Sequence, residues 1–327
     1  MKKIALYGSF NDNMLQALKE KCPDGFEQYY VPTGHDLSEL VQADYMVNRG
    51  GAVDSSVMDA ASKVKLIQKW GVGYDKIDVK EAGARGIPVA ICTGGNALPV
   101  AELTVTLMLD VLRNVLPLAE RLKRGEWARE EFSPRSYLLN NKTVGLVGIG
   151  NIAKKVAGIV QGGFHCQVLY YDIFRLSPEQ EQQLGVQYVD LDTLMSQADI
   201  VSIHVPLLDS TANMIDRSKL ERMKPTACLI NTSRGGVVNE EDLIHVLQEK
   251  RILGAGLDTF ALEPLPMTSE LLNMDCVVTT PHCGGNTADN DVNMAAICME
   301  NIARYDATQD SQMRAIVNRE FLKGATV

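Results

Sequence analysis

Short apolar runs alternate with longer segments whose apolar and polar positions follow the period of an amphipathic helix. The short runs predict β-strands, and the longer segments predict α-helices. Because the two kinds alternate from end to end, we expect parallel sheets with helices on both faces. The expected strands are Ile4–Tyr7, Tyr45–Asn48, Lys65–Lys69 and Val89–Ile91, then Thr143–Gly148, Gln167–Tyr171, Ile200–His204, Cys228–Asn231, Leu253–Leu257 and Val277–Thr279. The expected helices include Asn13–Lys21, Ser55–Ala61, Val79–Ala84, Val100–Leu112 and Val292–Tyr305.

The boundary between the two series of strands falls near Gly94–Pro99. Pro99 precedes Val100–Leu112 and so opens this long apolar helix where proline is tolerated best. The helix Val292–Tyr305 follows the last strand of the second series. Two long helices that bracket one series indicate that the chain crosses twice between two lobes. We therefore expect an α/β fold of two doubly wound parallel-sheet lobes. One is formed discontinuously by residues 1–98 and 290–327, and the other by residues 99–289.

Length, composition and charge exclude some classes of protein. A chain of 327 residues suits two α/β domains, and its 46% hydrophobic and 22% charged residues are typical of a soluble globular protein. The net charge of −9 argues against nucleic acid as a partner, since phosphate binding needs a basic face. No apolar run reaches the roughly 18 residues of a membrane span, and the N-terminus has no signal-peptide pattern.

The cysteine content indicates a reducing compartment. The seven cysteines form no CxxC pair, which favours reduced thiols in a cytoplasmic protein. Cys283 lies beside His282 and raises the alternative of a thiol nucleophile. Adjacent side chains usually point apart and no third group is evident, so a structural thiol is the better interpretation.

A glycine-rich motif follows the strand that begins at Thr143. Residues 148–153 fit the pattern G-x-G-x-x-[GA], directly after the strand and at the start of a helical pattern. Gly148 permits a tight turn, and Gly150 lets the backbone approach a pyrophosphate. Asn151 and Ile152 open the helix, whose free N–H groups and positive dipole end favour phosphate. Ala153 replaces the third glycine and is still small enough for close helix–strand packing.

An acidic residue supports this motif as a dinucleotide site. Asp172 ends the next strand about 20 residues on, where a carboxylate accepts hydrogen bonds from the adenosine ribose. A carboxylate there would repel a 2′-phosphate, which favours NAD(H) over NADP(H). Arg175 leaves the alternative open, because arginine can accommodate that phosphate. We therefore expect residues 99–289 to form a Rossmann NAD-binding domain.

Three expected strands in the second half are followed by chemically useful residues: Arg234, Glu263 and His282. Carboxyl ends of parallel strands are where doubly wound folds gather their sites. An enzyme that reduces a 2-oxo acid needs a fixed cation for the carboxylate and a proton donor for the carbonyl oxygen. Arginine and histidine supply these, and a neighbouring carboxylate would stabilise the imidazolium. The residues alone leave other interpretations open, namely a surface ion pair, a turn residue before proline and a hydrogen-bonded core histidine.

The chain resembles the D-isomer-specific 2-hydroxyacid dehydrogenases, the family of glycerate, phosphoglycerate, D-lactate and formate dehydrogenases. The resemblance covers nearly the whole chain. The matching segments are Gly71–Asp75, Val100–Glu102, the motif at Gly148, His204–Leu207, Asn231–Gly236, Asp258–Pro264 and Pro281–His282. It implies that the substrate lobe has a flavodoxin-like fold and that the Rossmann domain is inserted into it. It also implies a homodimer with the helix near Val100 in the interface, and no metal.

The same resemblance implies residue roles. Arg234 would bind the substrate, His282 would be the acid in reduction and the base in oxidation, and Glu263 would pair with His282. The backbone amides of Val72 and Gly73 would cradle the substrate carboxylate. Asn96 and Arg49 complete the expected substrate contacts. Asp258 would hydrogen-bond the nicotinamide carboxamide, and the dinucleotide cleft would be lined by Thr104, Val205, Pro206 and Thr232.

The resemblance implies that the substrate is a small 2-oxo acid or its D-2-hydroxy acid, as in a hydroxypyruvate/glyoxylate reductase or a related 2-hydroxyacid dehydrogenase. Formate dehydrogenases pair their histidine with glutamine, so Glu263 argues against formate. The loop after Tyr45–Asn48 carries one arginine, Arg49, which disfavours a phosphorylated substrate although Lys69 adds charge nearby. Pyruvate and larger 2-oxo acids stay open. The alternative function is a catalytically weak, NAD-sensing dimer of the corepressor type, which turnover would distinguish.

Overall fold

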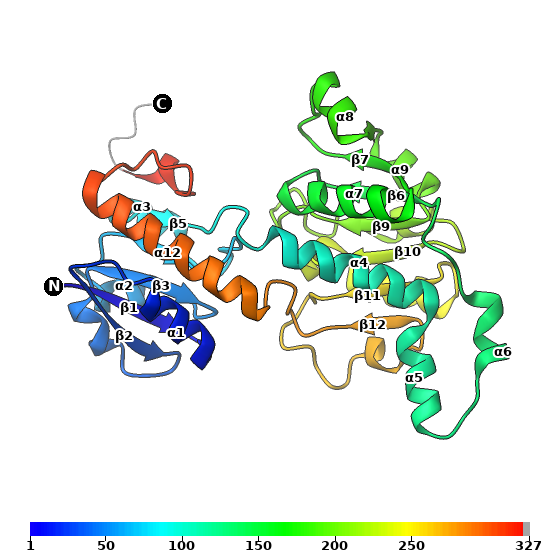
Figure 1. Ribbon diagram of the computed structural model, residues 1–327, viewed down its shortest axis with the longest axis horizontal. Helices are drawn as coiled ribbons and strands as arrows, with labels where there is room; N and C mark the ends of the chain where they lie inside the picture. The colour runs from blue at the N-terminus through cyan, green and yellow to red at the C-terminus, as the bar shows by residue number, and fades with distance from the viewer. Residues whose placement is uncertain (323–327) are drawn as a thin grey trace. The chain divides into compact units, whose positions relative to one another are not determined.

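The computed structural model describes residues 1–322, which divide into two compact units. The first unit joins Met1–Asn96 to the part of the chain that begins at Gly285, and the second is Ala97–Gly284. In Figure 1 the first unit therefore combines the blue and cyan N-terminal segments with the orange and red C-terminal segments. Each unit contains its own sheet and its own hydrophobic core.

The first unit contains five parallel strands in the order β2-β1-β3-β4-β5. This is the flavodoxin-like order, and it confirms the fold class expected for this lobe. Side chains of β1 alternate between two cores, with Ile4 and Leu6 on one face and Ala5 and Tyr7 on the other. The strands are β1 (Lys2–Gly8), β2 (Phe26–Pro32), β3 (Tyr45–Arg49), β4 (Ile67–Lys69) and β5 (Val89–Ala90).

Helices cover both faces of this sheet. On the face of Ile4 and Leu6, α1 (Asp12–Glu20) packs beside α12 (Ala288–Thr308), although they come from opposite ends of the chain (Figure 1). The other face is covered by η1 (Leu37–Gln42), α2 (Ser55–Ala60) and α3 (Val79–Ala84), and η5 (Arg319–Phe321) packs on α3. Asn11, Asp54, Asp78 and Thr287 cap their helices with side-chain oxygens, which satisfies backbone N–H groups of the first turns.

The second unit contains seven parallel strands in the order β12-β11-β10-β9-β6-β7-β8. The order reverses at β6, between β9 and β7, which is the switch point where open α/β sheets bind ligands. This Rossmann topology also confirms the fold expected from the sequence. The strands are β6 (Thr143–Val147), β7 (Gln167–Tyr171), β8 (Val186–Tyr188), β9 (Ile200–Ile203), β10 (Cys228–Asn231), β11 (Gly254–Leu257) and β12 (Val277–Thr279).

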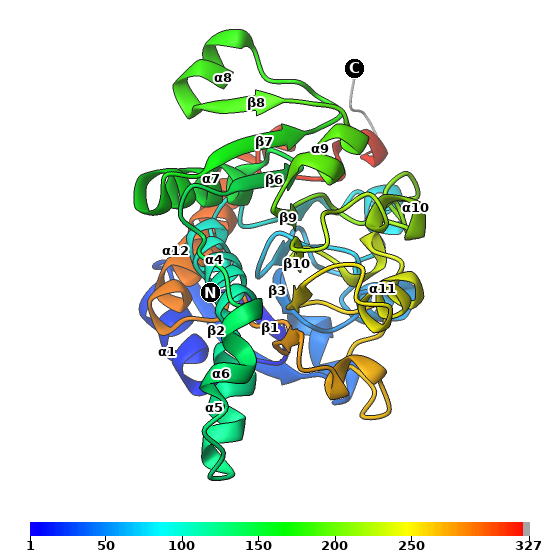
Figure 2. The same ribbon diagram turned by 90° about the vertical axis from the view of Figure 1, so that its right-hand side faces the viewer.

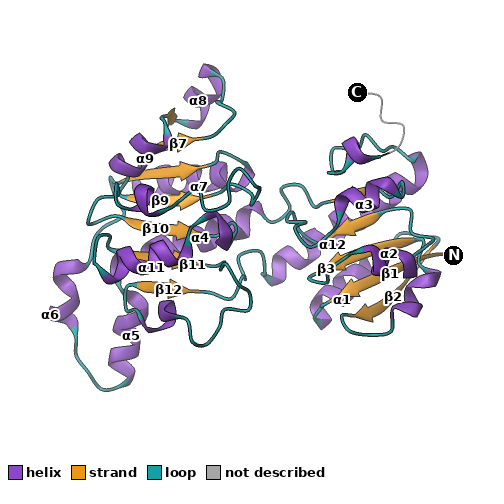
Figure 3. Ribbon diagram, turned by 180° about the vertical axis from the view of Figure 1, so that it is seen from behind, coloured by secondary structure: helices purple, strands orange, loops and turns teal. Residues whose placement is uncertain are grey.

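The helices of the second unit form two layers, which Figure 2 shows on opposite sides of the sheet. One layer is α4 (Ala97–Arg113) with α7 (Asn151–Phe164), and the other is α9 (Leu191–Gln197), α10 (Arg217–Leu220) and α11 (Glu240–Gln248). Figure 3 shows α5 (Val115–Lys123) and α6 (Arg129–Phe132) standing away from this sheet. The remaining elements are α8 (Pro178–Leu184), η2 (Ser133–Arg135), η3 (Gly235–Val237) and η4 (Glu270–Asn273).

The structure corrects three details expected from the sequence. Two strands were not expected, β2 and β8, and both lie at an edge of their sheet. Helix α4 begins at Ala97, so Pro99 lies within the first turn and does not open the helix. Proline is tolerated there because the first-turn N–H groups have no partner within the helix. Helix α12 extends beyond the expected range in both directions.

Two further observations concern the whole described chain. All seven cysteines are free, and Cys92, Cys166, Cys228 and Cys298 are buried. Within residues 1–322, no helix combines the length and apolar character needed to cross a membrane.

Candidate active site

Most of the residues expected in the second unit follow the carboxyl ends of its strands. Because all seven strands are parallel, these ends lie along one edge of the sheet. The glycine motif follows β6, Asp172 follows β7, Val205 and Pro206 follow β9, Thr232 and Arg234 follow β10, Asp258 and Glu263 follow β11, and His282 follows β12. The structure therefore gathers residues that lie up to 134 positions apart in sequence, between Gly148 and His282.

The glycine loop after β6 has the geometry of a phosphate cradle. Gly148 has φ +94°, and a Cβ there would lie 2.9 Å from the carbonyl carbon and oxygen of His204. At Gly150 a Cβ would meet nothing within 4 Å, so the space beside this backbone is open. Gly150 is also the N-cap of α7, and no side chain caps that helix. Within residues 1–322 the N–H groups of Asn151 and Ile152 have no protein acceptor, so the loop fits a dinucleotide pyrophosphate.

Asp172 is held beside this loop by the backbone. Its Oδ2 accepts a hydrogen bond from the N–H of Ile149 at 2.9 Å, and its Oδ1 accepts one from Phe174 at 3.0 Å. The N–H of Gly148 donates to the carbonyl of Tyr171 at 2.7 Å. The carboxylate is therefore fixed next to the phosphate cradle, where it fits the ribose of an adenine dinucleotide.

Glu263 and His282 form the expected pair. Glu263 Oε2 and His282 Nδ1 lie 2.7 Å apart, and Glu263 Oε1 accepts a hydrogen bond from the N–H of Phe260 at 3.1 Å. Burial opposes the ionisation of Glu263. The hydrogen bond with His282, the N–H of Phe260 and the charge of Arg234 outweigh burial and hold the pKa of Glu263 below its ordinary value. The structure therefore brings a carboxylate, an imidazole and a guanidinium into one electrostatic group.

Asp258 anchors the loop that carries His282. Its Oδ1 accepts hydrogen bonds from Thr280 Oγ1 at 2.6 Å and from the N–H of Cys283 at 2.8 Å. Its Oδ2 accepts one from the N–H of Gly284 at 2.9 Å. The side chain is buried, so these charge-assisted bonds hold the loop firmly. His282 itself has φ +50°, a left-handed conformation that the surrounding bonds sustain.

The loop that carries Arg234 is shaped by two neighbours. Asn231 Oδ1 accepts from the N–H and hydroxyl of Ser233 at 3.1 and 2.9 Å, and its Nδ2 donates to the carbonyl of Arg234 at 2.9 Å. Gly235 approaches the next loop so closely that a Cβ would lie 1.9 Å from the carbonyl carbon of Phe260. Sequence reasoning missed Asn231 as a positioning residue, although an asparagine directly after a strand is typical of such a turn.

Thr104 and Thr232 contact each other inside the second unit. Their hydroxyl oxygens lie 2.9 Å apart, and Thr104 also donates to the carbonyl of Val100 at 2.7 Å. On β9, Ser202 Oγ lies 2.9 Å from Nε2 of His204, which directly follows the strand. Burial lowers the pKa of His204 to about 4, so this imidazole is neutral at pH 7. Ser202 is a further residue that sequence reasoning missed.

The expected substrate residues of the first unit also share one sheet edge. Arg49 ends β3, Val72 and Gly73 follow β4, and Asn96 follows β5. Arg49 donates to the carbonyl of Ser9 and, at 3.4 Å, to Asn286 Oδ1. Burial lowers the pKa of Arg49, and Asp291 opposes that shift. Within the described chain, the N–H groups of Val72 and Gly73 have no protein acceptor, so they suit a carboxylate ligand.

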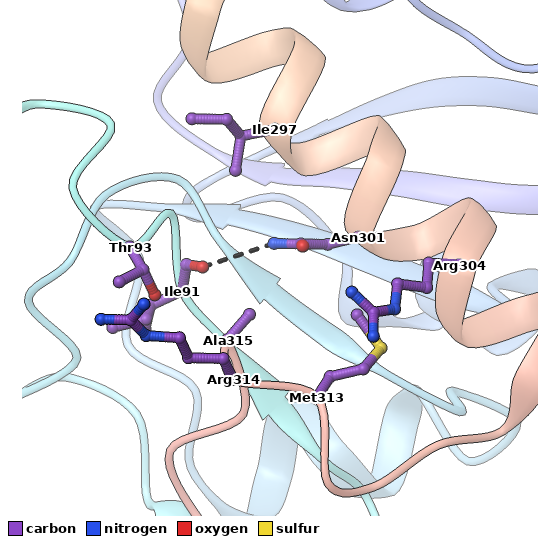
Figure 4. Close-up of a pocket in the computed structure, with 8 residues that line it drawn as sticks. All are labelled: Ile91, Thr93, Ile297, Asn301, Arg304, Met313, Arg314 and Ala315. Carbon is purple, nitrogen blue, oxygen red and sulfur yellow. Dashed lines mark hydrogen bonds between the residues drawn. The ribbon is translucent and has the colours of Figure 1, made fainter.

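A separate pocket of about 200 Å³ lies within the first unit (Figure 4). In it the Asn301 amide donates to the carbonyl of Ile91 at 3.4 Å. None of the residues expected at the site lines this pocket, so we do not assign the chemistry to it. Its lining residues are Ile91, Thr93, Ile297, Asn301, Arg304, Met313, Arg314 and Ala315. Among residues 1–322, no cluster of three or more histidine, cysteine, aspartate or glutamate side chains could hold a metal ion.

Comparison with known proteins adds independent findings. Residues 105–284 match the family described as D-isomer specific 2-hydroxyacid dehydrogenase, NAD binding domain. A glyoxylate reductase of Thermococcus litoralis is 38% identical over 280 residues, which cover 84% of each chain. A glyoxylate/hydroxypyruvate reductase B of Yersinia pestis is 38% identical over 303 residues, covering 91% of this chain and 92% of the relative.

A solved structure extends the likeness to the fold of both units. The NAD-complexed D-isomer specific 2-hydroxyacid dehydrogenase of Lactobacillus delbrueckii ssp. bulgaricus superposes with a TM-score of 0.79 at 29% identity. The likeness covers 97% of this chain and 100% of that chain.

Proposed function

Because this chain belongs to the D-isomer specific 2-hydroxyacid dehydrogenases, we propose that it reduces glyoxylate to glycolate and hydroxypyruvate to D-glycerate. The chain is an oxidoreductase, and its cofactor is NAD(H). The observation that carries the proposal is the 2.7 Å contact between Glu263 and His282, with the charge of Arg234 acting on the same carboxylate. This group offers a cation for a carboxylate and a proton for a carbonyl oxygen.

The proposed mechanism assigns one task to each side chain. Bound NADH supplies the hydride. Arg234 binds the 2-oxo acid by paired N–H donors and orients its carbonyl. His282 gives a proton from Nε2 to the carbonyl oxygen, because its Nδ1 is engaged by Glu263. The negative charge of Glu263 stabilises the protonated imidazole before transfer and fixes the orientation of the ring. In the oxidative direction the same nitrogen removes the hydroxyl proton.

Further roles are proposed for the other expected residues. Val72, Gly73, Asn96 and Arg49 make the first unit the substrate domain. The second unit is the NAD-binding domain, in which the open space at Gly150 and the carboxylate of Asp172 would hold pyrophosphate and ribose. Asp258 would reach the nicotinamide carboxamide from its place directly after β11. Thr104, Val205, Pro206 and Thr232 would border the dinucleotide.

The proposed substrates are small and unphosphorylated. Both curated relatives described above are named for glyoxylate reduction, and one is also named for hydroxypyruvate. Arg49, the last residue of β3, is the one arginine at this end of the strand, which offers little charge for a phosphate dianion. Glu263, in place of glutamine, argues against formate. The NAD-sensing alternative is not favoured, since both relatives described above are named as reductases.

The test is NADH absorbance with the purified protein against glyoxylate, hydroxypyruvate, pyruvate, phosphohydroxypyruvate, phenylpyruvate and 2-oxoisocaproate. We expect the highest kcat/KM with hydroxypyruvate or glyoxylate. A clear preference for phosphohydroxypyruvate or for a bulky 2-oxo acid would overturn the proposed substrate class. Binding of NADH without turnover of any acid would instead revive the sensing function.

We further propose a homodimer located in the cytoplasm. Several apolar side chains on and around α5 and α6 are exposed, which is a common feature of protein–protein interfaces. These are Val115, Leu116, Leu122, Trp127 and Leu138. The seven free cysteines support a reducing compartment.

A further inference from the structure

The loop after β7 contains two residues with opposite preferences for the cofactor. Asp172 suits the free ribose hydroxyls of NAD(H), whereas an arginine near this position accommodates the 2′-phosphate of NADP(H). Arg175 stands three residues after Asp172 and is exposed. The sequence alone leaves the balance between the two open, and the contacts of Arg175 decide it.

Arg175 is bound on the side of β7 that faces away from the glycine loop. Its Nε and Nη2 donate to Glu181 Oε1 and Oε2 at 2.8 and 3.1 Å, and its guanidinium lies 5.0 Å from the centre of the Tyr188 ring. Tyr188 belongs to β8, whereas the Asp172 carboxylate binds Ile149, which follows β6. Because β7 lies between β6 and β8 in the sheet, the two side chains point toward opposite neighbours.

Glu181 is itself firmly placed. Its Oε1 accepts a hydrogen bond from the buried Tyr170 hydroxyl at 2.7 Å, and the same hydroxyl accepts one from the N–H of Leu176 at 3.0 Å. Glu181 lies on α8, which begins with a capping box formed by Ser177 and Gln180. The hydrogen bonds from Arg175 and Tyr170 lower the pKa of Glu181, so the ion pair persists at neutral pH. A bidentate pair of this kind restricts the guanidinium more than a single contact would.

We propose that Glu181 is a specificity-determining residue that holds Arg175 away from the adenosine 2′-position, and so keeps the enzyme selective for NAD(H) over NADP(H). The inference rests on the proposed function, because it takes the site beside Asp172 to be the adenosine site. Without the carboxylate of Glu181, the ion pair that holds Arg175 is lost and its guanidinium can pair with a phosphate dianion.

The experiment measures nucleotide binding to the apo-protein and needs no turnover. Dissociation constants for ADP and for adenosine 2′,5′-bisphosphate are determined by titration calorimetry for the wild type and for Glu181→Gln. Glutamine keeps an acceptor for Tyr170 but removes the charge that holds Arg175. We expect affinity for the bisphosphate to rise about five- to tenfold, and affinity for ADP to stay within about twofold. The gain should shrink as salt is added, since it depends on charge.

Two controls separate release of Arg175 from other effects. Glu179→Gln removes the same charge from the same exposed helix, but Glu179 does not contact Arg175, so we expect no gain. Arg175→Ala combined with Glu181→Gln should abolish the gain. Glu181→Met, which removes both acceptor oxygens, should reproduce it.

Three results would overturn the inference. One is an unchanged bisphosphate affinity in both Glu181 variants, and another is a gain that persists without Arg175. Either result, with normal ADP binding, leaves the proposed function intact. The third is a wild type that binds no adenine nucleotide, which would overturn the proposed cofactor site together with the inference.

Discussion

At the scale of single residues, the Glu263–His282 pair combines a short hydrogen bond with considerable exposure. The His282 side chain is 46% exposed and that of Glu263 is 31% exposed. A surface ion pair of this kind contributes little to the free energy of folding, typically about 0–1 kcal/mol. The pair therefore serves to orient His282 and to place charge at the site. A substitution of either residue should lower kcat far more than it lowers the free energy of unfolding.

The variant His282→Ala tests whether this side chain serves catalysis and not folding. We expect kcat to fall about 10²–10⁴-fold, the usual share of general acid–base catalysis, with the urea midpoint of unfolding close to that of the wild type. His245 lies exposed on α11 and offers a matched histidine, so His245→Ala should leave kcat unchanged. Near-normal turnover of His282→Ala, measured by NADH oxidation, would remove His282 from its proposed role.

His204 predicts a pH dependence of stability. Its pKa is lowered to about 4 in the folded chain, below the ordinary value near 6.5 in the unfolded chain. The unfolded state therefore binds more protons between these values, and stability present above about pH 6.5 is lost as the pH falls toward 4. We expect the wild type to lose about 2 kcal/mol more than His204→Asn over this range, measured by urea unfolding. Equal losses in the two proteins would contradict the assignment.

At the scale of elements, the sequence predicted the strands with buried apolar runs, including the edge strands β5 and β12, and missed the edge strands β2 and β8. Strand β6 is an almost continuous apolar run, which is typical of a central parallel strand. Strand β2 carries Glu27 and Gln28, ends at Pro32 and is mostly half-exposed. Strand β8 has three residues. Most residues of β2 and β8 are only partly buried, so these two strands lack the run of apolar residues that reveals a buried strand.

The same contrast holds for the site. Arg234, Glu263 and His282 were singled out because each follows an expected strand, and their roles were implied by the resemblance to the family. The anchoring bonds of Asp258 and Asn231 were not predicted, since they depend on how loops fold back on themselves. The ion pair between Glu181 and Arg175 joins a helix to a loop. No pattern of apolar and polar residues in the sequence predicts such a pair.

Gly235 offers a prediction at this scale, because it joins the loops after β10 and β11. A Cβ at Gly235 would lie 1.9 Å from the Phe260 carbonyl carbon, so Gly235→Ala must separate the two loops. We expect a loss of about 1–3 kcal/mol in the free energy of unfolding. We also expect a fall in kcat/KM of up to about 100-fold, because Arg234 is displaced.

The neighbouring glycine provides the control. At Gly236 the atoms nearest to a Cβ belong to the Leu207 side chain, at 3.2 Å and beyond, and this side chain can move aside. Gly236→Ala should therefore retain most of the stability and activity. Similar losses in the two variants would show that the close approach of Gly235 to Phe260 is not the determining contact.

At the scale of the whole molecule, the ordered set of motifs along the chain identified the family correctly, and the family match and relatives confirm it. The NAD(H) cofactor expected from the glycine motif and Asp172 is confirmed in the same way. An oligomeric state leaves no comparable pattern in a sequence, because an interface and a core both use apolar residues. The structure adds one relevant feature, since Trp127 is 81% exposed and lies between α5 and α6.

The exposure of Trp127 predicts a substitution that would dissociate the proposed homodimer. Large apolar side chains exposed together mark an interface, and tryptophan often carries much of its binding energy. If a second copy of the chain covers α5 and α6, Trp127→Asp places a charge in a desolvated contact and should convert the dimer to a monomer. Light scattering after gel filtration should then give half the mass of the wild type. Val41→Asp, an exposed apolar position in the other unit, should leave the mass unchanged. An unaltered dimer in Trp127→Asp, or a wild type that is already monomeric, would place the interface elsewhere or remove it.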